Sequence, residues 1–369
     1  MHKAEVVETR IFVSLLFILS PYLLRSSLLV MADMCCTFFI VSGFYWLIKS
    51  QESLTIKSIL LFIGSITVAV LTRYAAIVIV SPMLVYLFIK SARQLSAYHF
   101  LFSGLLVALL FTPYLYVHRE LIENAEKHPW VQEWNFINFF KRSFETSDGN
   151  YQYSLPNMLY SFSPFVHPGF AFLGIVFIVL AKPRQLISLK YSWLLISIIT
   201  IYALFLAGIP FQNNRFLLLT FPFILLLFYP SFIQLLIYLR TKKLAVIFIT
   251  LCTVSQLALG IRAFLPFYKY NQTEKNIARS VNTFPPSTLY TFSYEGTLSY
   301  YSTPHKIISL YPSKLDTIKG NSYLLFNELA LSKQFAGKDP MINFEFIKST
   351  KKLVKIKEFE NGWTLYEIN

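Results

Sequence analysis

The sequence predicts an α-helical polytopic membrane protein of about nine transmembrane helices, followed by a small extracytoplasmic α/β domain. The first observation is composition: 55% of the 369 residues are hydrophobic and only 14% are charged, whereas soluble domains carry about 25% charged residues. The second is that the apolar residues gather in long, separate runs. The third is that residues 266–369 lose these runs and gain short β-rich segments. A soluble globular protein and a disordered chain are therefore excluded.

Each apolar run is expected to form one membrane span, which requires about 20 residues for a full crossing. The runs lie at 11–24, 32–48, 58–72, 74–89, 99–117, 169–181, 193–208, 216–239 and 244–265. Several are shorter than a full crossing, and Pro222 and Pro230 are expected to kink or split the run that contains them. The first run lacks a cleavage-site pattern and is expected to be a retained anchor.

Lysine and arginine are distributed unevenly between the connecting segments, which predicts the orientation of the helices. With the N-terminus in the cytoplasm, the cytoplasmic segments carry Lys3, Arg10, Lys49, Lys57, Lys90, Arg93, Lys182, Arg184, Lys190, Arg240, Lys242 and Lys243. The short outer segments carry only Arg25, Arg73 and Arg215. This orientation places the loop 118–168 and the tail 266–369 outside the cytoplasm.

The net charge of +14 does not indicate a nucleic-acid partner. About ten of these charges lie in residues 1–265, spread between apolar runs, as the charge bias of membrane proteins predicts. No basic patch interleaves with exposed aromatic residues. We expect these basic residues to interact with the lipid bilayer and not with nucleic acid.

Residues 1–265 are expected to form the transmembrane domain and residues 266–369 a separate α/β domain. Short β-rich runs occur in the tail at 288–292, 306–310, 323–326, 353–358 and 364–368. About 100 residues are enough for one small domain. The tail carries neither a GxGxxG nor a GxxxxGK[ST] pattern, so nucleotide binding has no support.

Arg25, Arg73 and Arg215 are the candidate binding residues because each lies at the outer end of an apolar run, where a charge is costly unless it is paired or solvated. A guanidinium group suits a phosphate at a membrane surface. Three of them on one face favour an anionic lipid site, and snorkelling to headgroups is the alternative for each alone. Asp33, the only acidic residue in the first five runs, either partners Arg25 or Arg73 or is a helix N-terminal carboxylate favoured by the dipole.

The long outer loop carries aromatic and acidic residues. Trp130 and Trp134 lie one helical turn apart and are expected either to stack on a sugar or to lie at the membrane interface. Glu120, Glu123 and Glu126 are spaced by three and are expected to form a solvated helix face. The histidines lack a metal-binding spacing such as HExxH, so no metal site is predicted.

Three short patterns together resemble the GT-C superfamily of bacterial membrane glycosyltransferases, which includes the aminoarabinose transferases and protein O-mannosyltransferase-like enzymes. The first, residues 21–33 (PYLLRSSLLVMAD), places a proline, serines and an aspartate before a helix. The second is Leu-Thr-Arg at 71–73 followed by Pro82. The third is the segment 210–215 followed by Pro222. Their order and spacing agree with the family, as does an outer α/β tail.

The resemblance implies transfer of a sugar from a polyprenyl-phosphate donor to an extracytoplasmic acceptor (lipid, glycan or protein) at the bacterial inner membrane, in the cell envelope. Arg73 and Arg215 fit the role of holding the donor phosphate. The family's catalytic carboxylate lies in its first outer loop, where it acts as base on the acceptor and helps to bind a divalent cation. This chain begins downstream of that loop, so we expect a truncated or inactive relative, with Asp33 as a disfavoured substitute base.

Three other functions fit a many-helix membrane protein. A non-catalytic protein could bind polyprenyl phosphate with the same arginines. A polymerase or ligase of surface polysaccharide shares the plan of many helices and one long outer loop, but the folded tail disfavours it. A transporter usually shows internal repeats, and none is evident in this sequence.

Overall fold

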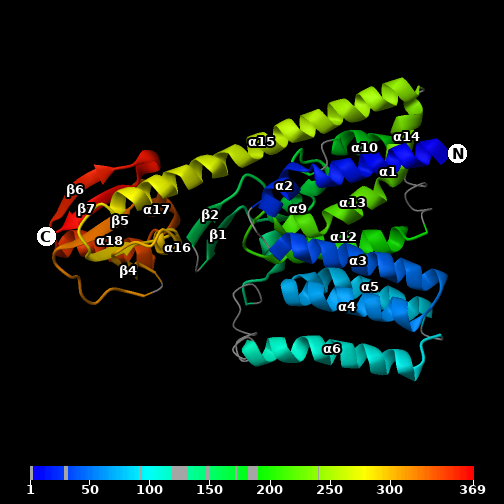
Figure 1. Ribbon diagram of the computed structural model, residues 1–369, viewed down its shortest axis with the longest axis horizontal. Helices are drawn as coiled ribbons and strands as arrows, with labels where there is room; N and C mark the ends of the chain where they lie inside the picture. The colour runs from blue at the N-terminus through cyan, green and yellow to red at the C-terminus, as the bar shows by residue number, and fades with distance from the viewer. Residues whose placement is uncertain are drawn as a thin grey trace. The chain divides into compact units, whose positions relative to one another are not determined.

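The computed structural model describes residues 3–28, 32–91, 94–118, 132–146, 149–170, 173–181, 190–239, 241–311 and 313–369. The chain folds as two compact units (Figure 1). We call Met1–Arg142 with Ser154–Ala263 the helical unit, and Ser143–Tyr153 with Phe264–Asn369 the α/β unit. Each unit has its own hydrophobic core.

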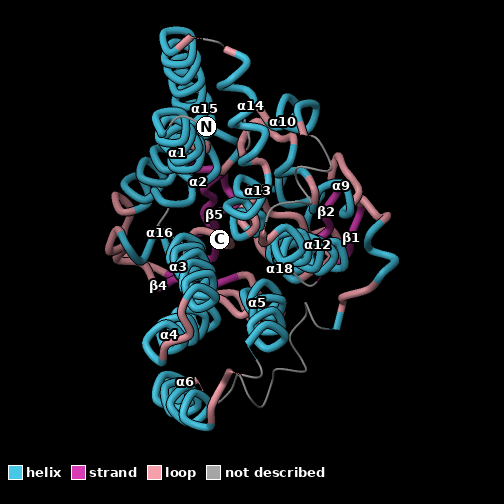
Figure 2. Tube along the Cα trace, turned by 90° about the vertical axis from the view of Figure 1, so that its right-hand side faces the viewer, coloured by secondary structure: helices cyan, strands magenta, loops and turns pink. Residues whose placement is uncertain are grey.

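The helical unit consists mostly of apolar α-helices. Its first elements are α1 (Lys3–Ile18), α2 (Pro21–Leu28), α3 (Ala32–Glu52), α4 (Ile56–Thr72), α5 (Ala76–Ser91) and α6 (Ala97–Val117). They are followed by η2 (Phe136–Phe139), α9 (Asn157–Ser161), η3 (Ser163–Phe165), α10 (Gly174–Leu180), α12 (Ser192–Gly208), η4 (Phe216–Leu219), α13 (Phe221–Leu227), α14 (Tyr229–Tyr238) and the first part of α15 (Lys242–Val281). Seen nearly end-on in Figure 2, α3 packs against α4 and α5, and α5 packs against α12.

Several described helices are long and apolar enough to cross a membrane, as expected for a membrane protein. The helices α3, α6 and α15 pass this test singly, and the bent pairs α1–α2 (51°) and α13–α14 (52°) raise the number to five if each pair is one span. Three further apolar helices, α4, α5 and α12, have only 16 or 17 residues. The finer expectation of nine spans stays a prediction.

The run 216–239 is split, as its prolines predict. It forms η4, α13 and α14, with Pro222 and Pro230 each in the first turn of a helix. A proline is tolerated there because its missing N–H would have no partner in the helix. The split run begins with η4, which packs against α3, the helix that carries Asp33.

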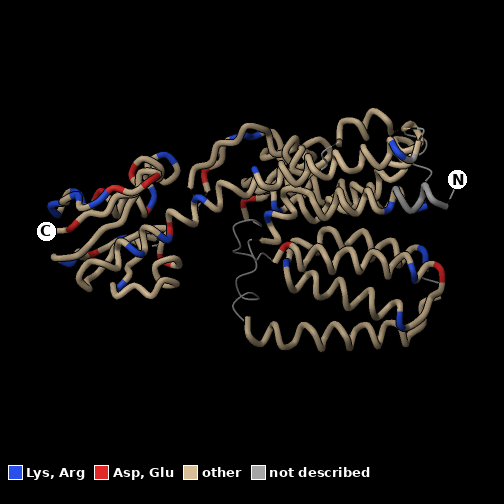
Figure 3. Tube along the Cα trace, turned by 45° about the horizontal axis from the view of Figure 1, so that its top comes forward, with Lys and Arg blue, Asp and Glu red and all other residues tan. Residues whose placement is uncertain are grey.

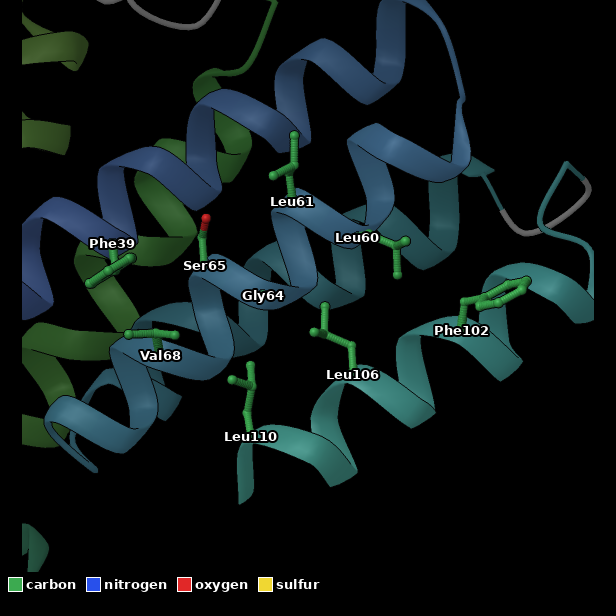
Figure 4. Close-up of a pocket in the computed structure, with 9 residues that line it drawn as sticks. All are labelled: Phe39, Leu60, Leu61, Gly64, Ser65, Val68, Phe102, Leu106 and Leu110. Atoms are coloured by element: carbon green, nitrogen blue, oxygen red, sulfur yellow. The ribbon is translucent and has the colours of Figure 1, made fainter. Parts of the chain in front are cut away.

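The last helix of the first group, α6, packs loosely along α4, and none of its residues is buried. Between α6, α4 and α3 lies an apolar cavity of about 390 Å³ (Figure 4). Its lining includes Phe39, Gly64, Ser65, Phe102 and Leu106. A helix that is apolar on all sides and unburied is typical of contact with lipid.

The α/β unit contains a five-stranded mixed sheet in the order β4-β3-β5-β7-β6. The strands are β3 (Thr288–Thr291), β4 (Lys306–Ser309), β5 (Ser322–Phe326), β6 (Leu353–Glu358) and β7 (Thr364–Ile368), and the helices are α16 (Glu295–Tyr300), α17 (Glu328–Gln334) and α18 (Asp339–Thr350). Strand β3 pairs in parallel with β4 and β5, and β7 pairs antiparallel with β5 and β6. All five strands predicted from the sequence are confirmed.

A hairpin from the long outer loop also belongs to the α/β unit. Strands β1 (Ser143–Thr146) and β2 (Gly149–Gln152) pair antiparallel. The amide of Gln334, the last residue of α17, donates to the hydroxyl of Tyr151 at 3.2 Å, and the ammonium of Lys338 contacts the carbonyl of Thr146. The α/β domain is therefore assembled from two separate segments of the chain.

Charged residues are distributed differently in the two units (Figure 3). In the helical unit most of them lie near helix ends, with Arg10 in α1 and Arg262 in α15 as exceptions, whereas they are frequent throughout the α/β unit. This pattern is expected if the helix middles face hydrocarbon, where a charge is costly.

Candidate functional site

Asp33, Arg73 and Arg215 meet at one end of the helical unit. Asp33 lies in the first turn of α3, Arg73 directly follows the last residue of α4, and Arg215 directly precedes η4. The guanidinium of Arg73 forms an ion pair with the carboxylate of Asp33. The Nε of Arg215 lies 3.9 Å from the second carboxylate oxygen, Oδ2. The alternative that Asp33 partners Arg73 is therefore confirmed.

Local backbone structure places Asp33 and Arg73 where their charges are favourable. A carboxylate near a helix N-terminus and a cation near a helix C-terminus are both stabilised by the helix dipole. The hydroxyl of Thr37 donates to the carbonyl of Asp33 at 2.7 Å and holds the first turn of α3. The backbone N–H of Arg73 donates to the carbonyl of Ala69 at 2.9 Å, so Arg73 caps α4 in an extended conformation.

The side chains of Asp33, Arg73 and Arg215 differ in exposure, and this difference determines which of them a ligand could reach. Asp33 is 3% exposed and Arg73 13%, whereas Arg215 is 40% exposed. One carboxylate thus serves two guanidinium groups, which leaves the cluster with a formal charge of about +1. The Nε of Arg215 has no hydrogen-bond acceptor among the described residues. A partly buried site with a surplus cation and an unused donor is suited to an anion.

The ring of Phe216 lies beneath both arginines. The guanidinium carbon of Arg73 is 4.4 Å from the ring centroid and that of Arg215 is 5.3 Å from it. The buried hydroxyl of Tyr202 donates to the carbonyl of Phe216 at 3.1 Å and fixes the backbone there. A cation above an aromatic face is stabilised by the ring's quadrupole. No sequence signal marks Phe216 beyond its position directly after Arg215.

The loop that carries Arg215 is anchored by side chains from the outer segment. Tyr160 on α9 donates to the carbonyl of Asn213 at 2.6 Å and accepts from its N–H at 2.8 Å. The side chain of Asn213 in turn accepts from the N–H of Arg215 at 3.1 Å. Asn157 donates to the carbonyl of Ala207 at 3.2 Å, just before the loop begins. These anchoring residues were not predicted, because single polar residues in a loop follow no periodic pattern.

Trp134 packs at the start of the same loop. Its indole N–H donates to the carbonyl of Phe205 at 3.0 Å. The ring lies so close to Gly208 that a Cβ there would come within 2.1 Å of the indole nitrogen. Trp134 thus takes part in packing, and neither of its predicted roles, sugar stacking or interfacial contact, is tested by this contact. Trp130 lies outside the described residues, as do Glu120, Glu123 and Glu126.

Arg25 lies in the last turn of α2, on the same helix as Tyr22, and the two side chains interact electrostatically. The side chain of Tyr22 also contacts Asn214, the residue before Arg215. Tyr22 therefore connects Arg25 to the loop that carries Arg215. The ion pairs of Asp33 are with Arg73 and Arg215.

The break between α1 and α2 is held by the loop that contains His167. The Oγ of Ser20 and the backbone N–H of Tyr22 both donate to the carbonyl of Gly169, at 2.9 and 3.0 Å. The N–H of Gly169 donates to Nδ1 of His167 at 3.0 Å, and Nε2 of His167 lies 3.4 Å from the Tyr22 hydroxyl. Burial lowers the pKa of His167. A neutral imidazole fits this arrangement, because Nδ1 must accept a hydrogen bond.

Within the described part of the chain, no group of three or more His, Cys, Asp or Glu side chains could hold a metal ion. The divalent cation that the resemblance implies therefore stays a prediction. Comparison with protein-family models, curated proteins and solved structures finds no match to this chain.

Proposed function

We propose that the helical unit binds the phosphate of a polyprenyl-phosphate-linked sugar at Arg73 and Arg215, and that the protein is a GT-C-like membrane glycosyltransferase. The observation that carries the proposal is the shared carboxylate: Asp33 pairs with Arg73, while the Arg215 side chain is 40% exposed and its Nε, a buried atom, has no hydrogen-bond acceptor among the described residues. The arrangement favours a ligand with one or two negative charges and several acceptor oxygens. A lipid phosphate meets both requirements.

The reaction in this proposal is displacement at the anomeric carbon of the sugar. The acceptor hydroxyl or amine forms the new bond, and the bond from sugar to phosphate oxygen breaks with its electron pair leaving on the phosphate. Arg73 and Arg215 would stabilise the charge that develops on that leaving group. The proton lost by the acceptor requires a base, and none is assigned among the described residues.

The membrane arrangement in this proposal has nine spans, a cytoplasmic N-terminus and an extracytoplasmic α/β domain at a bacterial inner membrane. The distribution of Lys and Arg between connecting segments supports the orientation. The apolar helices of membrane length support insertion. The donor phosphate and the acceptor would then meet at the outer surface of the bilayer.

The first test measures binding of a polyprenyl phosphate to the full chain in lipid nanodiscs, with the unphosphorylated polyprenol as ligand control. We expect Arg215→Gln to weaken binding of the phosphate by about 10-fold or more, since hydrogen bonds to a charged group contribute about 1.5–3 kcal/mol. Arg262→Gln is the matched control, because Arg262 is an exposed arginine near the end of another apolar run. Equal binding by the Arg215→Gln and Arg262→Gln variants, or equal binding of polyprenol, would reject the phosphate site.

A non-catalytic phosphate-binding protein is the second candidate, and one observation favours it. Asp33, the only acidic residue in the first five runs, is 3% exposed and engaged by Arg73, so it is poorly placed to take a proton from an acceptor. Transfer of a labelled sugar from a polyprenyl-phosphate donor, measured in the same nanodiscs, separates the two candidates. Binding with transfer supports the enzyme, and binding without transfer supports the second candidate.

A further inference from the structure

Two short elements of the outer segment expose apolar side chains at one end of the helical unit. On and after η2, Phe136 is 68% exposed, Phe140 is 76% exposed and Ile137 is also exposed. On α9, Met158 and Leu159 are exposed. The two elements are joined by a hydrogen bond from the N–H of Asn157 to the carbonyl of Lys141 at 3.3 Å. We call these five exposed apolar residues the η2–α9 surface.

The polar side chains of the same two elements point the other way. Asn138 is buried and donates to the carbonyls of Glu133 and Gly208, at 2.9 and 2.8 Å. Asn157 is fully buried and accepts from Gln212 at 2.9 Å. A loop that faces water usually turns polar residues outward and apolar residues inward. Here two amides are buried while five large apolar side chains are exposed, although Phe139 and Tyr160 of the same elements are buried.

Two further observations indicate whether the η2–α9 surface faces water or lipid. Both elements pack against α12 and are hydrogen-bonded to its C-terminal end, and α12 itself exposes apolar side chains, including Ile201 and Leu204. Lys141 and Arg142 are exposed at the border of the η2–α9 surface. Apolar and aromatic groups flanked by cations are typical of segments that lie in the interface of an anionic bilayer.

We infer that the η2–α9 surface is inserted in the outer edge of the lipid bilayer, with Lys141 and Arg142 at the level of the anionic headgroups. Interfacial segments of this kind bury their apolar face about 5–10 Å deep. The buried amides of Asn138 and Asn157 would then connect the start of the loop that carries Arg215 to η2 and α9, which are held at this depth. The inference goes beyond the proposed function because it does not depend on a bound phosphate or on catalysis; it rests on that proposal only for the orientation that places this segment outside the cytoplasm.

The test places a nitroxide spin label at Phe140→Cys or Leu159→Cys in the full chain, reconstituted in nanodiscs that contain anionic phospholipid. The native cysteines are first replaced by Cys35→Ser, Cys36→Ala and Cys252→Ala. Collision of the label with oxygen, which concentrates in lipid, is compared with collision with a nickel chelate, which stays in water. Leu109→Cys on unburied α6 is the lipid-facing control, and Lys352→Cys in the α/β unit is the water-facing control.

Labels at 140 and 159 are expected to collide with oxygen at least several times more often than Lys352→Cys does, and to approach the values at Leu109→Cys. Nickel-chelate access equal to that of the water-facing control would overturn the inference. Low access to both reagents would also overturn it, because a partner protein or a second copy would then cover the surface.

A second measurement keeps the inference testable if the cysteine replacements disturb folding. Benzoylphenylalanine in place of Phe140 retains the native cysteines and an aromatic side chain, and light cross-links it to whatever lies next to it. A phospholipid adduct, detected by mass spectrometry, supports the inference. An adduct with another protein chain, or the absence of any intermolecular adduct, contradicts it.

Discussion

Two ion pairs of this protein, one in each unit, differ in how far water reaches them. In the α/β unit, Lys348 and Glu328 pair at 3.1 Å with both side chains about half exposed. In the helical unit, Asp33 and Arg73 pair with both side chains largely buried. Exposed pairs contribute about 0–1 kcal/mol because water screens them. A buried pair costs much to desolvate and is sensitive to loss of either partner, so its presence among apolar helices indicates a role beyond stability.

Removing the shared carboxylate is expected to have the largest effect. Asp33→Asn leaves Arg73 and Arg215 buried or half-buried without a counter-charge, and loss of one partner of a buried pair destabilises by about 3–5 kcal/mol. Unfolding of the full chain in detergent, followed by circular dichroism, measures this change. Asp33→Asn at wild-type stability would show that the ion pair is energetically similar to a surface pair.

Within the helical unit, the close packing of Trp134 on Gly208 can be compared with the open surroundings of Gly104 on α6. Gly208→Ala is expected to displace the indole ring, and overpacking of this kind costs about 1–3 kcal/mol. A shift in tryptophan fluorescence should accompany the lower melting temperature. The control is Gly104→Ala on α6, where a Cβ meets nothing within 4 Å, and where alanine should be neutral or slightly stabilising. Equal behaviour of the two variants would contradict the close contact.

Acidification is expected to weaken the helical unit through His167. Burial lowers the pKa of His167 in the folded protein, so the unfolded chain binds a proton more readily. Its stabilising contribution is therefore complete above the ordinary histidine pKa of about 6.5 and is lost as the pH falls below it towards the lowered folded value. Melting temperatures measured at about pH 7.5 and about pH 5, on either side of that ordinary pKa, test this expectation, and His167→Gln should reduce the difference. If the melting temperature of His167→Gln depends on pH as strongly as that of the wild type, His167 is not the cause of the dependence.

The smallest effect is expected in the α/β unit. Glu328→Gln removes the partner of Lys348, but both side chains are about half exposed. The free energy of unfolding should change by about 0.5 kcal/mol or less. Denaturant unfolding compared directly with that of Asp33→Asn measures the contrast between the units. A change as large as that of Asp33→Asn would mean that exposure does not decide the strength of these pairs.

The α/β sheet was predictable from sequence, and the hairpin attached to its unit was not. Strands such as β6 and β7 stand out as short β-rich runs in a polar context. The hairpin is held by the contact of Tyr151 with Gln334, which are 183 positions apart. No local pattern encodes a contact over that distance.

The candidate site was partly predictable for a similar reason. Asp33 and Arg73 were singled out because a charge in an apolar context is conspicuous, and this made Arg73 one of two possible partners of Asp33. The anchors Asn157 and Tyr160 were missed because polar residues in a loop are ordinary. The boundary between the runs 58–72 and 74–89 matches the end of α4 at Thr72, whereas the count of nine spans stays a prediction.

The unequal number of charges around Asp33 has a consequence for any measurement of affinity. Among the described residues, the two guanidinium groups and the one carboxylate carry a surplus positive charge, which is expected to attract a negative ion from the surroundings. The phosphate of the proposed function would then compete with such an ion for the arginines. Its apparent dissociation constant should rise with the chloride or phosphate concentration of the buffer, and two ligands can be ranked only when both are titrated against the same competing salt.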